Sequence, residues 1–250
     1  MIQMTSNKKS IPFTKRIMEF QRICDHKGIF ARTPFLSLDE QEELSASSTH
    51  YEVIADGGFR NAERKQMILL PQGYMGEYSF AITILRSKYS SNFSKLTHRD
   101  VLGALMGLGI EREVVGDILI EEDHISIAVS DSIAPYIKDQ LTQIGRTGVS
   151  FEEYEGELSI QANIKYSQAT VSSMRLDKLC ATLAHLSRGD AQQMIQVGNI
   201  AVNGKVITDT SYIVECGKRI SIRHYGKYVI EEILGTTKKE NYVIRYGKYI

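Results

Sequence analysis

The sequence has few of the features that mark secreted or membrane proteins. It has three cysteines in 250 residues, Cys24, Cys180 and Cys216, and no C-x-x-C pair. An odd number without that pairing predicts neither a disulfide framework nor a zinc ribbon, and it fits a reducing cytosol. No apolar run approaches the length of a membrane span, and the first ten residues lack the apolar segment of a secretory signal. We therefore expect a cytoplasmic protein without membrane contact.

Motifs of catalysis are also missing. The six histidines are scattered, with no H-E-x-x-H and no metal-ligand spacing. Neither the G-x-S-x-G of serine hydrolases nor the G-x-x-x-x-G-K-[ST] of a phosphate-binding loop occurs in the chain. We therefore predict no catalytic residue, no metal site and no cofactor.

The net charge of the chain is zero, but positive and negative residues are unevenly distributed along it. The 30 Lys and Arg residues balance the 30 Asp and Glu residues. Residues 1–170 sum to −5, residues 173–230 to +4 and residues 231–250 to +1. Positive charge confined to one segment predicts that any contact with RNA is localised there. A solvated surface rich in Lys and Arg explains the same charge equally well.

The pattern of residues 173–230 predicts two short helices and a small β-sheet. Apolar residues from Leu176 to Leu186 recur at helical spacing. Ser187, with Asp190 three residues later, is a capping box that starts a second helix. Asn203-Gly204 is a strong hairpin signal between two short strands.

Four motifs in this stretch resemble the RNA-binding domain named for ribosomal small-subunit protein four, called the S-four-type domain below. They are R-L-D-K-L at 175–179, L-S-R at 186–188, V-G-N-I-x-V-N-G-K at 197–205 and I-S-I-R-x-x-G-K at 220–227. In that family two helices and the adjoining loop form one face that binds RNA. The matching positions are Arg175, Lys178, Ser187, Arg188, Gln192, Asn203, Lys205, Arg223 and Lys227. The chain departs from the family at Gly217-Lys218, where Gly-Asp is usual, and at His224, where Gly is frequent; both changes keep positive character.

The rest of the chain predicts an α+β protein with several parts. Residues 1–50 form a helical N-terminal segment, with apolar spacing from Phe13 to Cys24. Residues 51–156 predict the order β-α-β-β-α-β, the split βαβ sandwich of ferredoxin-like and RNA-recognition folds. Its expected elements are strands at Tyr78–Arg86, Gly116–Glu121, Ile125–Ser130 and Val149–Tyr154 and helices at Thr97–Leu108 and Asp131–Ile144. We expect a linker at 157–172 and an extension at 231–250 that adds a strand at Tyr242–Tyr246.

Two basic clusters lie in the N-terminal half. Gly57-Gly58 makes a tight turn before Arg60, Arg64 and Lys65, and Asn61 is suited to cap a helix. His98 and Arg99 follow Thr97, at a helix start that normally prefers carboxylates. Backbone N–H groups and cations in either place can hold a phosphate. A capped surface helix and solvated side chains explain them as well.

Three further segments extend the resemblance to nearly all of residues 13–230. G-G-F-R-N-A-E-R-K at 57–65, L-T-H-R-D-V-L-G-A-L-M-G-L-G-I at 96–110 and G-D-I-L-I at 116–120 resemble the bacterial YlmH family. There a helical lead-in and an RNA-recognition-like domain precede the S-four-type domain. The resemblance implies binding of rRNA and tRNA on the large ribosomal subunit and rescue of stalled large subunits that hold a nascent chain. It also implies a monomer off the ribosome and a second RNA contact at Arg60, Arg64, Lys65, His98 and Arg99.

Two other functions remain open at this point. An RNA-modifying enzyme acting on rRNA or tRNA would use a cleft near Gly57-Gly58 and His98-Arg99. The triplet Arg175-Leu176-Asp177 superficially resembles a pseudouridine synthase motif, but it falls within the first helix of the S-four-type domain. A protein–protein adaptor would use the acidic N-terminal half, with RNA binding incidental.

Overall fold

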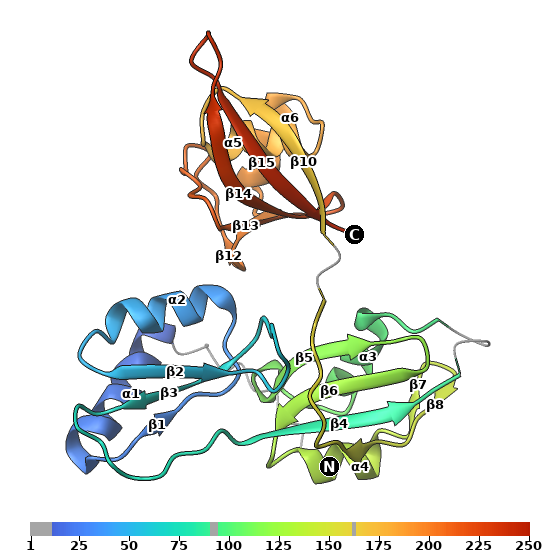
Figure 1. Cartoon of the computed structure of the whole chain (residues 1–250). Coiled ribbons are helices and arrows are strands. Elements are labelled where there is room, and N and C mark those ends of the chain that lie inside the picture. Colours follow the sequence, from blue (N-terminus) through green and yellow to red (C-terminus); the bar gives the residue numbers. More distant parts are fainter. Residues whose placement is uncertain (1–11, 91–94, 162–163) are drawn as a thin grey trace, which may run out of the picture. The chain divides into compact units, whose positions relative to one another are not determined.

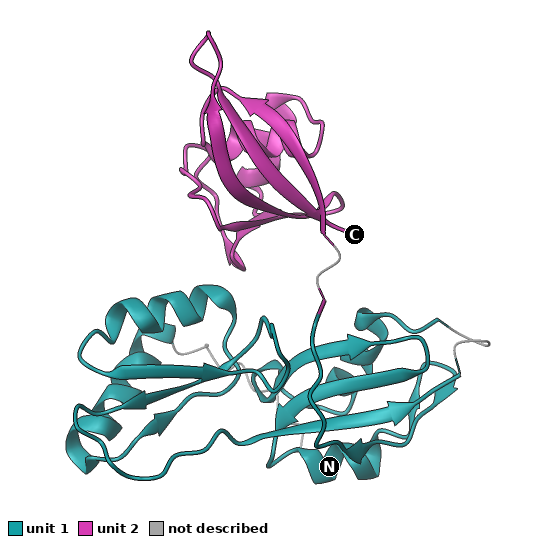
Figure 2. Ribbon diagram, viewed as in Figure 1, with its two compact units in different colours: residues 1–160 teal, residues 161–250 magenta. Residues whose placement is uncertain are grey.

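A computed structural model describes residues 12–90, 95–161 and 164–250 of the chain (Figure 1). They form two compact units, residues 1–160 and residues 161–250 (Figure 2). Both units combine helices with antiparallel sheets, so the α+β class is confirmed. In the described part of the chain, no helix is long and apolar enough to cross a membrane.

Unit 1 begins with a small layer of helices on a sheet. Its elements are α1 (Phe13–Lys27), β1 (Ala31–Arg32), α2 (Leu38–Ser47), β2 (Glu52–Asp56) and β3 (Gln66–Leu70). The strand order is β1-β3-β2, and Ile17, Leu44 and Leu69 belong to the core between the helices and the sheet. The N-terminal segment is therefore not purely helical, because β1 pairs with β3 across the boundary expected at residue 50.

The rest of unit 1 is the split βαβ sandwich that the sequence predicts. Its elements are β4 (Ile82–Lys88), α3 (His98–Gly107), the 3₁₀ turn η1 (Arg112–Val114), β5 (Val115–Ile120), β6 (His124–Ser130), α4 (Ala134–Gln140), β7 (Gln143–Ile144), β8 (Thr147–Gly148) and β9 (Glu152–Glu153). The main sheet has the order β5-β6-β4-β9, with every pair antiparallel. Both helices pack on one face of it, through Val101 and Leu105 of α3 and Ile137 of α4.

Three boundaries in this sandwich differ from the prediction. The first strand begins at Ile82 rather than Tyr78, and the last is only two residues long. The second helix ends at Gln140, because Gln143–Ile144 turns back to pair with Thr147–Gly148 as a hairpin. Local apolar spacing predicts Gln143 and Ile144 as helical, because it does not include their pairing with Thr147 and Gly148.

Unit 2 places two helices on a six-stranded antiparallel sheet. Its elements are β10 (Ile164–Val171), α5 (Leu176–Leu183), α6 (Arg188–Gln196), β11 (Ile200–Val202), β12 (Lys205–Val206), β13 (Arg219–Ile222), β14 (Gly226–Thr236) and β15 (Tyr242–Tyr249). The order is β10-β15-β14-β13-β11-β12. The predicted linker at 157–172 is wrong over 164–171, because these residues pair along their whole length with β15. The strand expected at Tyr242–Tyr246 lies within β15.

Candidate nucleic-acid interface

The starts of α5 and α6 lie beside one another in unit 2, since Arg188 at the start of α6 contacts Asp177 at the start of α5. Leu176, Leu179 and Cys180 are fully buried and hold α5 on the sheet. The predicted cap of α6 is present: the Ser187 hydroxyl accepts a hydrogen bond of 3.1 Å from the backbone N–H of Asp190. These contacts fix the side chains that leave the two helix starts.

Asp177 joins the two helices through three side chains. Its carboxylate is fully buried and accepts hydrogen bonds from Arg175 Nε at 3.0 Å and Arg175 Nη2 at 3.3 Å. It also accepts from Arg188 Nε at 3.1 Å and Gln192 Nε2 at 3.0 Å. Three of the residues predicted to bind RNA therefore converge on one acidic residue that was not predicted.

The ionisation of Asp177 follows from these contacts. Burial by itself raises the pKa of a carboxyl group, but hydrogen bonds from Arg175, Gln192 and Arg188 outweigh burial and lower the pKa of Asp177 to about 2. The carboxylate is thus charged at neutral pH. The hydrogen bond from Arg175 to this carboxylate in turn raises the pKa of the guanidinium, so the arginine stays charged.

Both arginines reach solvent while they hold Asp177. The side chain of Arg175 is 34% exposed and that of Arg188 is 54% exposed. Arg188 donates its Nε to Asp177, and more than half of its side chain stays exposed. A guanidinium that is held by a carboxylate on one side and exposed to solvent on the other can donate hydrogen bonds to a phosphate group. We call Arg175, Arg188, Gln192 and Asp177 the helix-start cluster.

Other predicted residues take different positions in unit 2. Lys178 is partly exposed on α5, and Lys205 is exposed in the β11–β12 hairpin. Asn203 is buried, and its side-chain oxygen accepts a 2.7 Å hydrogen bond from the backbone N–H of Arg219. With φ at 50°, it turns the hairpin and ties it to β13. Asn203 therefore has a structural role rather than a place on an exposed RNA face.

Arg223 and Lys227 lie at the turn between β13 and β14 and at the start of β14. Tyr228 is buried in the core under α5 and α6, and successive side chains in a strand point to opposite faces, so its neighbour Lys227 projects away from the helices. Arg223 is exposed in the turn that follows β13. The single RNA face expected for unit 2 is therefore divided between the helix-start cluster and the outer face of the sheet.

In unit 1, the loop from Gly57 to Lys65 is part of the core rather than a capped surface helix. No helix follows Asn61, which has φ of 63°. The Arg64 guanidinium is partly buried and donates to the backbone oxygens of Phe35 at 2.7 Å, Val115 at 3.2 Å and Arg112 at 3.4 Å. Burial lowers the pKa of Arg64 from its usual range. Arg64 therefore holds the fold together, and it is Arg60 that is exposed in this loop.

The five residues of the expected second RNA contact do not share one face. The loop of Arg60 and Lys65 packs on the sheet side of Ile84 and Ala128, where a Cβ on Gly58 would meet both side chains. His98 and Arg99 are exposed at the start of α3, which packs on the opposite side. The capping box is confirmed there, with Thr97 N–H donating to Asp100 at 2.8 Å. The sheet thus separates the two basic clusters.

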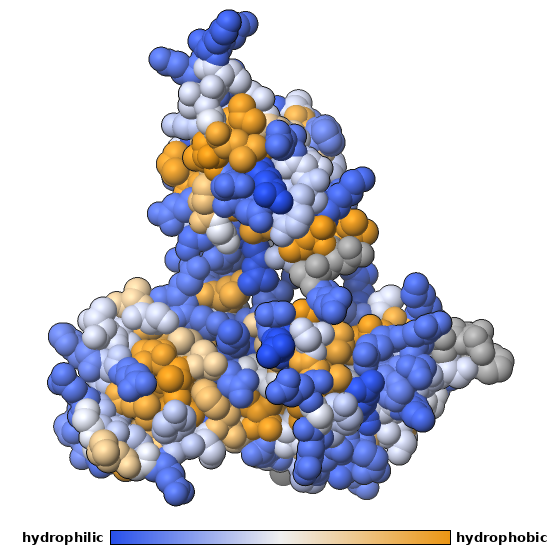
Figure 3. Space-filling model, viewed as in Figure 1, coloured by the Kyte–Doolittle hydropathy of each residue, from blue (hydrophilic) through white to orange (hydrophobic). Residues whose placement is uncertain are grey.

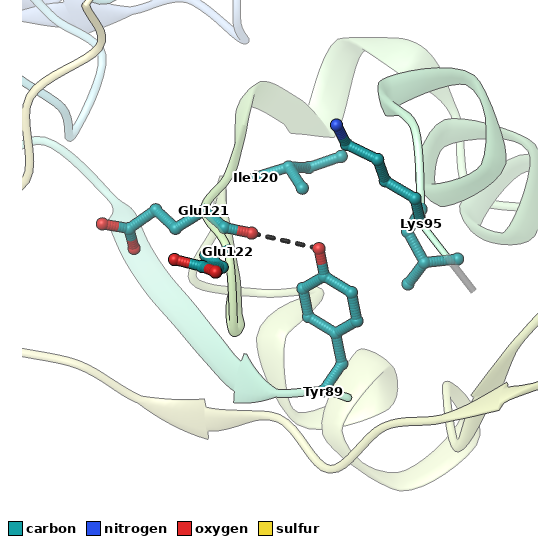
Figure 4. Close-up of a pocket in the computed structure, with 6 residues that line it drawn as sticks. Tyr89, Lys95, Ile120, Glu121 and Glu122 are labelled. Carbon is teal, nitrogen blue, oxygen red and sulfur yellow. Dashed lines mark hydrogen bonds between the residues drawn. The ribbon is translucent and has the colours of Figure 1, made fainter. Parts of the chain in front are cut away.

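A pocket of about 550 Å³ lies at the end of β4, beside Lys95 and Glu122 (Figure 4). The Tyr89 hydroxyl donates across it to the Glu121 backbone oxygen at 3.0 Å. Neither Gly57-Gly58 nor His98-Arg99, where the enzyme hypothesis expects its cleft, lines this pocket. Within residues 12–90, 95–161 and 164–250, no group of three or more His, Cys, Asp or Glu side chains is placed to hold a metal ion.

Two family models match the chain in the regions just described. Residues 76–157 match the "Putative RNA-binding domain in YlmH". Residues 174–220 match the S4 domain, which contains the whole helix-start cluster. The two matches confirm the order of domains that the sequence motifs imply.

Similar proteins cover the chain to different extents. The "Ribosome-associated protein quality control protein P2" of Bacillus subtilis is 36% identical over 241 residues, which is 94% of each chain. An "Uncharacterized RNA pseudouridine synthase" of Aquifex aeolicus is 34% identical over 73 residues, 29% of this chain and 27% of that protein. The solved "Cell division protein ylmH from Streptococcus pneumoniae" has 30% identity and a TM-score of 0.49, covering 62% of this chain and 95% of that one. On the full-length match and the two domains, the chain belongs to the YlmH family.

Proposed function

We propose that this protein is a non-enzymatic RNA-binding protein of the cytoplasm that binds rRNA and tRNA on the large ribosomal subunit. Its role would be the rescue of stalled large subunits that carry a nascent chain. The name of the Bacillus subtilis relative, which refers to ribosome-associated quality control, supports this role. The observation that carries the RNA-binding part is the helix-start cluster, in which buried Asp177 positions two exposed arginines.

The helix-start cluster suits the backbone of a structured RNA. Arg175 and Arg188 are held side by side through one carboxylate, so little conformational freedom is lost when they bind. The start of α6 adds backbone N–H groups and the positive end of the helix dipole. Arginines that grip phosphates recognise the shape of RNA rather than its sequence. Lys178 of α5 and Ser187 at the start of α6 extend the positive or polar surface around them, and Lys205 is exposed in the β11–β12 hairpin of the same unit.

Unit 1 would provide a weaker contact, to tRNA or to a second rRNA element. We assign it to the exposed Arg60 with Lys65, or to His98 with Arg99, as separate places rather than one site. Two weak sites on one chain raise the overall affinity, because the second binds at a high effective concentration. The chain would act as a monomer when it is off the ribosome.

The first test is the sedimentation of a cell lysate through a sucrose gradient at low and raised salt. The proposal expects the protein to migrate with free large subunits at low salt and to leave them at raised salt, since phosphate contacts depend strongly on salt. Migration only at the top of the gradient would contradict ribosome binding. A second candidate, an RNA-modifying enzyme, rests on the partial pseudouridine synthase match. Nucleoside mass analysis of rRNA and tRNA after incubation would reveal a new base if that candidate were right.

A further inference from the structure

One edge of the sheet in unit 2 is formed by β10. It is the first strand in the order β10-β15-β14-β13-β11-β12, and Figure 1 shows it at the side of the sheet. Within the described part of the chain, β10 pairs with β15 alone. In an antiparallel pair, every second residue directs its backbone N–H and C=O groups away from the partner strand. These groups of β10 are therefore placed to receive a further strand.

β10 lacks the features that usually protect an edge strand. Natural edges are short, bulged, interrupted by proline or lined with charges. β10 is eight residues long, pairs with β15 without a register shift, contains no proline and carries one charged residue, Lys165. The strand at the opposite edge, β12, has only two residues. In Figure 3 the surface over β10 is mostly pale, as expected for side chains of weak hydropathy.

The larger side chains of β10 leave the backbone of this edge accessible. Val171 is buried under the helices, so alternation places Ile164 and Tyr166 on the opposite face of the sheet. A Cβ on Gly247 of β15 would meet both of these side chains. The ring of Tyr166 also lies against Arg245 of β15, with 5.0 Å between the guanidinium carbon and the ring centroid. Both side chains therefore lean over β15, toward the middle of the sheet.

The charge near the start of β10 indicates which strand would fit beside it. Lys165 lies directly opposite Lys248 of β15, and like charges at opposed positions of two strands repel each other. A strand added outside β10 would place one of its own residues opposite Lys165, with about 5 Å between the Cβ atoms. An acidic residue at that position would offset the repulsion. The edge is thus complementary to an extended segment that carries a carboxylate.

We infer that the edge of β10 binds an extended polypeptide segment as a seventh, antiparallel strand, with an acidic residue opposite Lys165. Main-chain hydrogen bonds supply the affinity of such an added strand, and the acidic residue fixes its register. The inference goes beyond the proposed function, because it gives unit 2 a protein partner in addition to RNA. Neither activity depends on the other.

The test uses the full chain and a fluorescein-labelled peptide, Ser-Thr-Val-Thr-Thr-Val-Glu-Thr, with binding measured by fluorescence anisotropy. In an antiparallel strand beside β10, the glutamate of this peptide lies opposite Lys165. We expect a dissociation constant below about 1 mM. A peptide with lysine in place of the glutamate should bind about three- to fivefold more weakly, the effect of one cross-strand charge pair. Lys165→Glu should reverse this preference, and the control Lys239→Glu, at an exposed turn residue of unit 2, should keep it.

A third peptide, with proline in place of both valines, tests the hydrogen bonds. The two positions differ in parity, so one of the lost N–H groups faces β10 in either register, and binding should fall at least tenfold. Amide hydrogen exchange followed by NMR should show that the first peptide slows every second amide of β10 and leaves β12 unchanged.

Four results would overturn the inference. They are no binding of the first peptide up to about 1 mM, equal binding of the proline peptide, a preference for glutamate that Lys165→Glu leaves unchanged, and slowed exchange of the β10 amides with a 20-nucleotide oligouridylate but not with the peptide. Sedimentation velocity of the chain alone gives a further test. A dimer in which the same amides exchange slowly without peptide would assign the edge to a second copy of the chain and contradict the inference.

Discussion

Replacing Asp177 by Asn tests whether the buried carboxylate organises the helix-start cluster. The amide imitates a protonated carboxyl group in size and charge, so the variant loses what ionisation contributes to folding. The pKa of Asp177 is lowered from 3.8 to about 2, and that difference corresponds to about 2 kcal/mol at neutral pH. The new NH₂ group also faces guanidinium donors, which adds about 1 kcal/mol. We expect a loss of about 2 to 3 kcal/mol in the free energy of unfolding of unit 2.

Hydrogen exchange with mass spectrometry measures this loss in the full chain. Peptides of α5 and α6 should exchange about 30- to 150-fold faster in the variant at neutral pH, as the free-energy change requires. Peptides of unit 1 are an internal control and should keep their rates, since the contacts of Asp177 all lie in unit 2. RNA affinity should fall at the same time, because Arg175 and Arg188 lose their common partner. Unchanged exchange in α5 and α6 would refute the reasoning.

Three other predictions concern the pH dependence of unit 2, the hairpin residue Asn203 and the buried contacts of Arg64. The lowered pKa of Asp177 contributes stability to unit 2 above pH 4 that is lost as the pH falls toward 2. Between pH 5 and pH 2 the free energy of unfolding should therefore fall by about 2 kcal/mol more in the wild type than in Asp177→Asn, which keeps the contribution of other carboxylates such as Asp209. Asn203→Ala should lower the free energy of unfolding of unit 2 by about 2 to 3 kcal/mol, because it removes the hydrogen bond to Arg219 and places alanine at a left-handed φ. Hydrogen exchange in β11 and β13 measures this loss. Asn203→Gly should lower the free energy by about 1 kcal/mol less, and equal losses would contradict the role of φ. Arg64→Met should destabilise unit 1 by about 2 kcal/mol by leaving backbone oxygens without donors, whereas Arg60→Met should leave thermal unfolding unchanged.

Local patterns in the sequence predicted the elements that depend on near neighbours. The capping box at Thr97 is formed, and at Ser187 the side-chain cap is formed without the reciprocal bond to Asp190; each contact joins residues three positions apart. The hairpin at Asn203-Gly204 is also formed, with both residues at positive φ. The order β-α-β-β-α-β followed from apolar periodicity within each segment.

Contacts between distant residues explain what the sequence did not predict. The sequence alone predicts a linker in place of β10, because the partner strand, β15, lies more than seventy residues later in the chain. The role of Asp177 depends on Arg188 and Gln192, which come from the next helix and donate hydrogen bonds to its carboxylate. The sequence does contain one indication that Asp177 is buried. It follows Leu176 and precedes Leu179 and Cys180, so it lies at the border of the apolar side of α5. Arg64 appeared basic and available, but the fold surrounds it with backbone oxygens.

The central claim is that the helix-start cluster binds the large ribosomal subunit, and one measurement tests it most directly. Purified wild-type protein, Arg188→Glu and Arg146→Glu are each pelleted with purified large subunits at physiological salt. Arg146 is an exposed residue in a turn of unit 1, so its variant makes the same change in net charge outside the cluster. We expect the wild type and Arg146→Glu to pellet with the subunit and Arg188→Glu to stay in the supernatant. If Arg188→Glu pellets as well as the wild type, the helix-start cluster is not the ribosome-binding surface.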